Sequence, residues 1–289
     1  MRICWITDNK LGDSRFGGAE ITNDYMIKEG IKRGHFIEII SPRDCNKMCV
    51  FSAKYDLFIL NNIFDFNYFL FDLIKGTSYM FYHHDYNFCV YRNADCEKYK
   101  CNMCENSKAY MEYSSLFQKA KLNIFLSPLH QKLTENKIPG LTSMVIPVPL
   151  DLKLFKDYGK ARKHDYIYFG NIYLGKGILE TIHKYKNVHF YGRVWDKKLI
   201  KEIESMGHKY LGSVKYEDMP KILNKYKYFI RGTVLKESFG RSTIEAKACG
   251  CEVLSNTIIG VDSFDLTDKE LLNQCGTAPK TFWDKVEAL

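Results

Sequence analysis

The sequence predicts an α/β protein with two doubly wound parallel sheets, and three observations support this fold class. Short runs rich in β-branched and aromatic residues alternate with helical patterns, as parallel α/β architecture requires. A chain of 289 residues with 46% apolar content can form two domains of about 150 residues, each burying its own core. The alternation begins again after a polar, basic stretch at 156–164, which predicts a linker there.

The first half of the chain carries strand candidates and one clear helix. The helix is expected at 19–33 and is ended by Gly34. Strands are expected at 2–7, 36–41, 55–61, 78–84, 122–127 and 143–148. We therefore assign residues 1–155 to an N-terminal domain.

The second half repeats this organisation, and we assign residues 165–277 to a C-terminal domain. Strands are expected at 165–171, 188–193, 208–214, 226–232 and 251–256, with helices starting at 177, 196, 217 and 241. Residues 278–289 are amphipathic and predict a terminal helix. Its apolar side chains would cover the core of the N-terminal domain or dock on a partner.

Charge and composition narrow the classes of ligand. The net charge is +8, of which +6 falls on 156–289, and this suits a diphosphate, a nucleic acid or an acidic membrane surface.

The apolar run at 57–74 is broken by polar residues and falls short of the roughly 18 to 20 apolar residues of a membrane span. The opening "MRICWIT" enters a strand without the pattern of a secretory leader, so we expect a cytoplasmic protein with reduced cysteines.

The stretch "KESFGRSTIEAKACGCEVLSN" (236–256) places Glu237 and Glu245 on either side of a glycine turn and a helix start. Gly240 allows close approach of a ligand to the backbone, and unpaired N–H groups at 241–243 favour an anion. The two carboxylates could then accept hydrogen bonds from hydroxyls on both sides of it, which is the layout of a nucleoside diphosphate sugar. Spacing alone favours two solvated surface glutamates; the surrounding residues change that interpretation.

This stretch resembles the signature of family 4 retaining glycosyltransferases of the GT-B fold: Glu, a hydrophobe and Gly, a second Glu followed by Ala, then Ala-x-Gly and a buried strand. The resemblance extends over nearly the whole chain and implies two Rossmann-like domains that face a central cleft. It implies catalytic roles for His84, Lys176 and Glu237. It also implies donor contacts from Gly17, Gly18, Asn171, Lys176, Glu237, Ser238, Phe239, Gly240, Arg241, Ser242, Thr243 and Glu245.

Other segments also carry the resemblance, among them "NIFLSPLH" (123–130) and "VIPVPLDLKLF" (145–155), which resemble the last strand of the first domain and the crossing after it. "GDSRFGGAEITNDYMIKEG" (12–30) is similar to the glycine loop of the family, with Gly17 and Gly18 facing phosphate and acceptor. "FYHHDY" (81–86) resembles the segment whose histidine, His84 here, contacts the transferred sugar; a histidine pair is otherwise a core or surface feature. In "YFGNIYLGKG" (168–177), Lys176 matches the lysine that holds the leaving diphosphate.

Asn171 departs from the family, which has an arginine at this position. Removal of one cation from a diphosphate site typically costs a few kcal/mol. Either Arg231 or Arg241 substitutes for it, or catalysis is weak or absent and the chain is a binding module. The resemblance implies a UDP-sugar or GDP-sugar donor and no divalent cation. A saccharide or lipid-linked hydroxyl is the expected acceptor, with a modified base in DNA as the alternative; peripheral contact with a membrane or a nucleic acid is left open.

Four cysteines, Cys89, Cys96, Cys101 and Cys104, form a Cys-x6-Cys-x4-Cys-x2-Cys pattern. Four thiolates can hold a closed structural zinc site, but the spacing is not that of a regular zinc ribbon, so free thiols or a disulfide remain alternatives. We expect this segment to shape a loop beside the acceptor. A third hypothesis, a zinc-dependent nucleic-acid adaptor, rests on the cysteines and the net charge alone.

Overall fold

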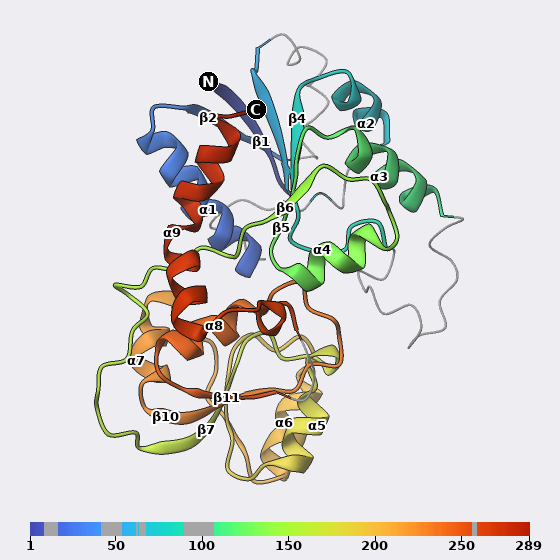
Figure 1. The fold of residues 1–289 in the computed structure, drawn as a ribbon. Helices are drawn as coiled ribbons and strands as arrows, with labels where there is room; N and C mark the ends of the chain where they lie inside the picture. Colours follow the sequence, from blue (N-terminus) through green and yellow to red (C-terminus); the bar gives the residue numbers. More distant parts are fainter. Residues whose placement is uncertain (9–16, 42–53, 62, 64–67, 90–106, 256–258) are drawn as a thin grey trace. The chain divides into compact units, whose positions relative to one another are not determined.

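The computed structural model describes residues 1–8, 17–41, 54–61, 63, 68–89, 107–255 and 259–289 (Figure 1). The chain divides into two compact units. One comprises Met1–Pro149 and Thr277–Leu289, and the other comprises Leu150–Gly276. Each unit is built on a parallel sheet, so the predicted fold class of two parallel α/β domains is confirmed.

The first unit contains a parallel sheet of order β2-β1-β3-β4-β5-β6. Its strands are β1 (Arg2–Ile6), β2 (Phe36–Ile40), β3 (Leu57–Asn61), β4 (Tyr79–Tyr82), β5 (Asn123–Phe125) and β6 (Ser143–Val145). Strands β3 and β4 are buried along their whole length, as expected where helices cover both faces of a sheet. Strand β6 is shorter than predicted because it lies at the sheet edge and Pro147 follows it.

Helices cover both faces of this sheet. They are α1 (Gly18–Lys32), α2 (Tyr68–Lys75), α3 (Lys108–Lys119) and α4 (Pro128–Glu135). Figure 1 shows α1 on one side of the sheet and α2 and α3 on the other. Alternate residues of β1 serve the two sides: Trp5 packs on Phe282 at 5.9 Å between ring centres, whereas Cys4 and Ile6 join the core that includes Phe117.

The last helix, α9 (Asp268–Val286), begins earlier than the terminal helix expected at 278–289. Phe282, Trp283 and Val286 are buried in the first unit. The Trp283 indole donates a hydrogen bond to the Met26 carbonyl at 2.6 Å. Its ring also lies so close to α1 that a Cβ added at Gly30 would be 2.1 Å from Trp283 Cζ2. Gly30 therefore makes room for the indole.

The second unit has a parallel sheet of order β11-β10-β7-β8-β9. Its strands are β7 (His164–Phe169), β8 (His189–Tyr191), β9 (Lys209–Tyr210), β10 (Tyr226–Arg231) and β11 (Glu252–Ser255). Its α-helices are α5 (Ile178–Lys184), α6 (Lys198–Ser205), α7 (Met219–Leu223) and α8 (Arg241–Ala248), and its 3₁₀ turns are η2 (Leu174–Lys176), η3 (Tyr216–Asp218) and η4 (Gly260–Ser263). The edge strand β9 is short because Gly212, with φ of 79°, leaves the extended conformation soon after it.

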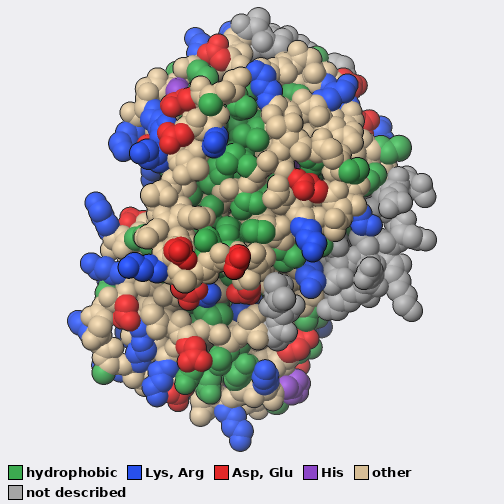
Figure 2. All heavy atoms as spheres, viewed as in Figure 1, with side chains coloured by type: hydrophobic (Ala, Val, Ile, Leu, Met, Phe, Trp, Pro, Cys, Tyr) green, Lys and Arg blue, Asp and Glu red, His purple; other side chains and the backbone are tan. Residues whose placement is uncertain are grey.

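The surface carries both signs of charge. On the face drawn in Figure 2, Lys and Arg side chains lie mainly around the margin and are interspersed with Asp and Glu. No helix among the described residues combines the length and apolar character needed to cross a membrane.

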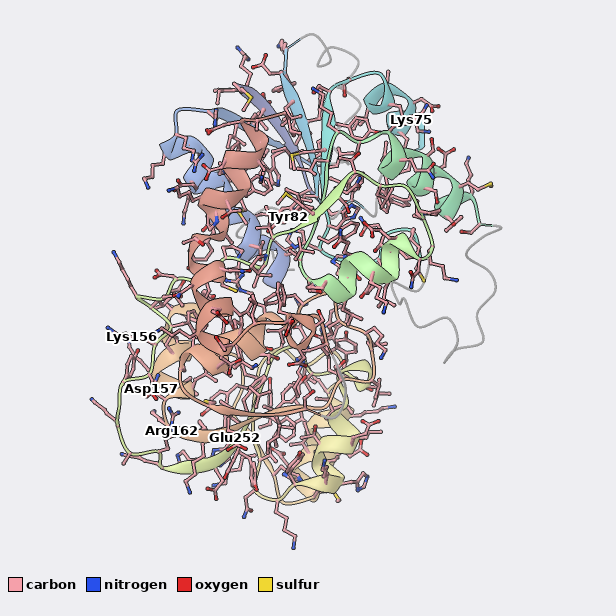
Figure 3. All side chains as sticks on the ribbon, viewed as in Figure 1. Lys75, Tyr82, Lys156, Asp157, Arg162 and Glu252 are labelled. Carbon is pink, nitrogen blue, oxygen red and sulfur yellow. The ribbon has the colours of Figure 1, made fainter. Side chains whose placement is uncertain are left out.

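The segment 156–164, which we expected to be a linker, is bonded to the second unit. Arg162 pairs with Asp157 at 3.1 Å, and Figure 3 labels both residues. Arg162 also donates to the carbonyls of Tyr226 and Cys249, both at 2.8 Å. Asn224 bonds to the backbone at both Lys156 and Tyr158. The division between units falls instead between Pro149 and Leu150 and between Gly276 and Thr277.

Candidate functional site

The strand order of the second sheet indicates where a ligand would bind. β8 and β9 lie on one side of β7, whereas β10 and β11 lie on the other, so the winding reverses between β7 and β10. In open parallel sheets, ligands bind beyond the carboxyl ends of the strands at such a reversal. The two segments that leave the sheet there are 170–177 after β7 and 232–240 after β10, and they contain Lys176 and Glu237.

Glu237 is the centre of an ion cluster at this point. Lys176 Nζ donates to Glu237 Oε1 at 2.6 Å, and Arg231, the last residue of β10, donates to the same oxygen. The side chains of Lys176, Arg231 and Glu237 are 18%, 4% and 11% exposed. Burial raises the pKa of Glu237, but the attraction of Arg231 and then Lys176 outweighs burial and lowers the pKa to about 2. The carboxylate is ionised, and the three side chains together carry one net positive charge.

Two glycines allow the segments after β7 and β10 to touch. Gly177 has φ of 67°, and a Cβ added there would lie 1.2 Å from the Gly232 carbonyl oxygen. A Cβ added at Gly232 would lie 2.8 Å from Thr181 Oγ1. Lys176 directly precedes Gly177 at the end of η2, so this close backbone contact determines where its ammonium group lies.

Asn171, the residue that departs from the resembled pattern, is exposed. Its carbonyl accepts a hydrogen bond from the Tyr168 hydroxyl at 3.0 Å. The neighbouring Gly170 lies against Arg231, because a Cβ added at Gly170 would be 3.7 Å from a terminal guanidinium nitrogen. A guanidinium group is therefore present beside this loop, but it comes from β10.

Helix α8 starts directly after the glycine turn, as the sequence predicts. Gly240 has φ of 94°, and a Cβ there would lie 2.4 Å from Ile259 Cδ1. Arg241, Ser242 and Thr243 form the first turn, whose dipole favours an anion. The Thr243 N–H donates to the Gly240 carbonyl at 2.9 Å, so this amide already has a partner.

The loop before α8 is fixed by η4. Glu237 and Phe239 accept backbone hydrogen bonds from Gly260 at 3.0 Å and Val261 at 2.8 Å. The Phe239 side chain is buried and contacts Phe264, with 6.1 Å between ring centres. Ser238, between them, is half-buried. The backbone around Glu237 is thus held at both ends of the loop.

Glu245 has its own partners within the second unit. It is 2% exposed, and its Oε1 accepts from Arg241 Nε at 2.9 Å and from the Tyr216 hydroxyl at 2.8 Å. Arg241 also donates to the Tyr216 oxygen at 2.9 Å. Burial raises the pKa of Glu245, and the nearby Arg241 and Tyr216 offset part of that effect. The two glutamates of the signature therefore sit in two separate networks.

In the first unit, Gly17 and Gly18 begin α1. Gly17 is extended, with φ of −153°, and its N–H donates to Glu20 Oε2 at 2.8 Å. The Gly18 carbonyl accepts from the Thr22 hydroxyl. The Gly17 amide is thus bonded to a carboxylate of its own helix, and residues 9–16, which complete the glycine loop, lie outside the described residues.

The two histidines after β4 differ in environment. His83 is 1% exposed, its Nε2–H donates to Asn123 Oδ1 over 2.9 Å, and its ring stacks on Phe125 at 4.4 Å between ring centres. Burial lowers its pKa to about 3. His84 is half-buried and contacts the Tyr82 ring at 4.8 Å. His83 is therefore a core residue, and His84 is the member of the pair nearer to solvent.

The cysteine pattern is only partly described. Cys89 is buried in the first unit, whereas Cys96, Cys101 and Cys104 lie outside the described residues. Within the described part of the chain, no group of three or more His, Cys, Asp or Glu side chains is placed to hold a metal ion. Zinc binding by the four cysteines stays a prediction.

Sequence reasoning missed several residues of these networks. Gly232 follows β10 directly and Gly177 lies at the end of the segment that leaves β7, so glycines in the segments after two neighbouring parallel strands could have indicated close contact. Tyr216 had no such signal, because its contact with Glu245 links residues far apart in the chain. In the first unit, Asn23 donates to Asn61 at 2.8 Å at the carboxyl end of β3, a buried amide pair that was also not predicted.

No protein-family model and no curated protein matches the sequence. Solved structures do match its fold. The chain is similar to sucrose-phosphate synthase from Thermosynechococcus elongatus, with a TM-score of 0.72, 14% identity, and 100% of this chain and 94% of the other covered. It is also similar to the HepE protein of Anabaena in complex with UDP-glucose, with a TM-score of 0.67, 15% identity, and coverage of 98% and 91%.

A third similar structure is an alpha-glucosyltransferase in complex with UDP and a 13-mer DNA, with a TM-score of 0.59, 13% identity, and coverage of 98% and 90%. At these identities the likeness concerns the fold. The chain has the GT-B fold of these proteins, built from two parallel α/β domains.

Proposed function

We propose that the protein is a glycosyltransferase that takes a sugar from a nucleoside diphosphate and transfers it to a hydroxyl group. The ion cluster of Lys176, Arg231 and Glu237 at the reversal of the second sheet carries this proposal. It offers the Lys176 ammonium group for a diphosphate beside a carboxylate for sugar hydroxyls. The HepE protein of the same fold was crystallised with UDP-glucose, so we take a UDP-sugar as the first candidate donor and a GDP-sugar as the second.

The donor would extend along the segment after β10. Glu237 and the backbone at 238–240 would bind the sugar hydroxyls, and Lys176 with the first turn of α8 would bind the diphosphate. Glu245 would accept from the ribose hydroxyls through Oε2, since Tyr216 and Arg241 both bond to Oε1. From the first unit, Gly17, Gly18 and His84 would contact donor or acceptor.

We propose that transfer retains the anomeric configuration. The bond from the anomeric carbon to the diphosphate oxygen breaks, and a bond from that carbon to the acceptor oxygen forms on the same face. The acceptor proton passes to the departing phosphate oxygen. Negative charge grows on the diphosphate during this step, so the Lys176 ammonium stabilises the transition state more than the ground state. With that cation and the α8 dipole supplying the stabilisation, we propose that no divalent metal is required.

Release of nucleoside diphosphate from a panel of UDP, GDP and ADP sugars, with and without a chelator, tests this proposal. We expect steady turnover of a UDP-sugar or GDP-sugar in the presence of chelator. Glu237→Gln should lower turnover by about a hundredfold while the circular dichroism spectrum is unchanged. Tight binding without turnover would instead identify a binding module, and no binding of any donor would contradict the proposal.

A saccharide or lipid-linked hydroxyl is our first candidate acceptor. The second is a hydroxylated base in DNA, because one protein of the same fold was crystallised with a DNA containing an HMU base and this chain carries a net charge of +8. Transfer of radiolabelled sugar to duplex DNA with and without that base distinguishes the two. Labelled DNA that requires the modified base would favour the second candidate.

A further inference from the structure

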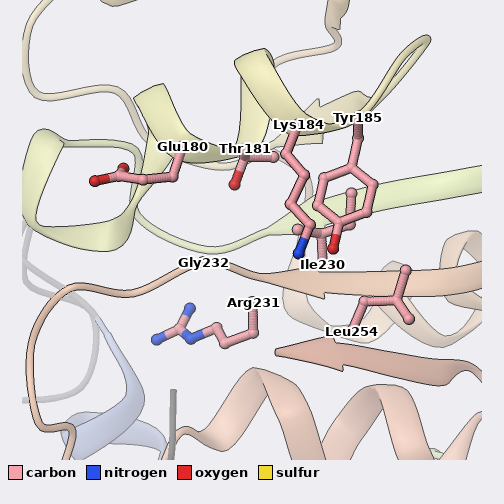
Figure 4. Close-up of a pocket in the computed structure, with 8 residues that line it drawn as sticks. All are labelled: Glu180, Thr181, Lys184, Tyr185, Ile230, Arg231, Gly232 and Leu254. Atoms are coloured by element: carbon pink, nitrogen blue, oxygen red, sulfur yellow. The ribbon is translucent and has the colours of Figure 1, made fainter. Parts of the chain in front are cut away.

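Arg231 is the most deeply buried member of the ion cluster. It is the last residue of β10 and is 4% exposed. Arg231 lines a small pocket together with Glu180, Thr181 and Lys184 of α5, and Figure 4 shows its guanidinium group directed away from these three side chains. The guanidinium group donates a hydrogen bond to Glu237 and lies beside Gly170. Its contacts are therefore with the protein.

Lys176 reaches the same carboxylate oxygen from a different environment. It is 18% exposed, its ammonium group lies 5.8 Å from the centre of the Tyr173 ring, and it sits on a short 3₁₀ turn. A lysine side chain also has more freedom to redirect its charge than a buried arginine held at the end of a strand. Of the two cations on Glu237, Lys176 is the one able to move to a phosphate.

We propose that Arg231 is a positioning residue that keeps the Glu237 carboxylate ionised and aimed at the donor sugar while Lys176 leaves it for the diphosphate. This inference rests on the proposed function and deepens it. It also explains how the site can have Asn171 in place of the arginine of the resembled pattern: the guanidinium group beside the loop comes from Arg231 of β10 and acts through Glu237.

The physical reason lies in the burial of Glu237. Burial raises the pKa of this carboxyl, and only the two cations reverse that effect. Once Lys176 turns to the diphosphate, Arg231 is the cation that remains. A carboxylate 11% exposed without any cation would take up a proton, and a protonated Glu237 would accept hydrogen bonds from sugar hydroxyls less well.

The direct test is the titration of Glu237 in Lys176→Gln, which mimics departure of the lysine. Carbon-13 NMR of labelled glutamate carboxyls, assigned with Glu237→Gln, reports its pKa without any requirement for activity. We expect the Glu237 pKa to stay below the ordinary value of 4.5 in Lys176→Gln and to rise above that value in the double variant Lys176→Gln/Arg231→Gln. A pKa at or above 4.5 in Lys176→Gln alone would overturn the inference.

Binding and turnover supply the second test. Arg231→Gln should leave UDP affinity within about threefold of wild type, lower turnover of the sugar nucleotide by about a hundredfold, and move the acid limb of kcat/KM to higher pH. When Glu237→Gln is already present, adding Arg231→Gln should change turnover by less than about threefold, because both substitutions act through the Glu237 carboxylate. Lys227→Gln is the matched control, since Lys227 lies on the same strand and pairs with exposed Asp165.

Loss of UDP affinity in Arg231→Gln as large as in Lys176→Gln would show that Arg231 binds the diphosphate directly and would overturn the inference. The inference would also be overturned if Arg231→Gln lowered turnover in the Glu237→Gln background as much as it does in the wild type. If Arg231→Gln fails to fold, Arg231→Lys and the double variant Arg231→Gln/Glu237→Gln replace it, because neither leaves an uncompensated buried charge. A wild type that binds no nucleotide refutes the proposed function, while the NMR titration still decides the role of Arg231.

Discussion

At the scale of single residues, Glu237 and His83 are both buried but differ in charge, because only Glu237 has partners of opposite charge. Glu237 is buried and ionised because two cations outweigh its desolvation, whereas His83 is buried with a neutral partner and stays uncharged. The sequence predicted Lys176 and Glu237 from the family pattern that the two stretches around them resemble. It named Arg231 only as a substitute cation, because the return of the chain from β10 to Glu237, which makes them partners, is not visible in a linear pattern.

The buried histidine predicts a loss of stability in mild acid. The pKa of His83 is about 3 in the folded protein and 6.5 ordinarily, so the unfolded chain binds a proton first as the pH falls. Stability that is present above pH 6.5 is therefore lost toward pH 3, and His83 should contribute a loss of about 2 kcal/mol between pH 7 and pH 5. Urea unfolding at several pH values measures this loss. His83→Gln should show a smaller dependence on pH; equal dependence in both proteins would contradict the prediction.

At the scale of elements, strands were more predictable than helix ends. Runs of β-branched and aromatic residues located every strand of both sheets, because burial on both faces makes those runs continuous. The ends of β6 and β9 were misplaced since edge strands stop where a proline or a left-handed glycine intervenes. Helix α9 was placed too late: it starts at Asp268 and continues through Pro279, a residue type that usually interrupts a helix.

The contact between the segments after β7 and β10 predicts a strong effect at Gly177. Alanine there adds a Cβ 1.2 Å from the Gly232 carbonyl oxygen as well as an unfavourable φ. We expect Gly177→Ala to cost about 3 kcal/mol or more of unfolding free energy and to abolish donor binding, because the backbone next to Lys176 must shift. Gly159→Ala is the matched control: its φ of 64° is similar, but nothing lies within 4 Å of the added Cβ. That control should cost only about 1 kcal/mol and leave binding unchanged. Equal losses in the two variants would refute the role of the contact.

The packing of α9 on α1 predicts a second glycine effect, in the first unit. In Gly30→Ala the new Cβ would lie 2.1 Å from Trp283 Cζ2 and 2.7 Å from Ile37 Cδ1. We expect a loss of about 2 kcal/mol in urea unfolding, since the indole cannot move away without breaking its hydrogen bond to Met26. Gly76→Ala, where the added Cβ meets only a carbonyl oxygen at 3.5 Å, should be close to neutral. A neutral Gly30→Ala would show that the helices are not packed this tightly.

At the scale of the whole molecule, the fold is better determined by sequence pattern than the site is. Alternating strands and helices predicted two parallel sheets, and proteins 13–15% identical share this architecture over nearly their whole length. Very different sequences thus adopt this fold, because many apolar sequences satisfy the same burial pattern. The side-chain networks do not follow from that pattern: Tyr216 reaches Glu245 and Gly177 meets Gly232 only after the sheet has brought distant loops together.

The central claim is that a diphosphate binds at the reversal of the second sheet through Lys176. Calorimetric titration with UDP, in the presence of chelator, tests it most directly. We predict that wild type and Lys227→Gln bind UDP with equal affinity and that Lys176→Gln binds it about ten to a hundred times more weakly, as expected for loss of one charged hydrogen bond to phosphate. Absence of binding in the wild type, or equal binding in Lys176→Gln, would contradict the account.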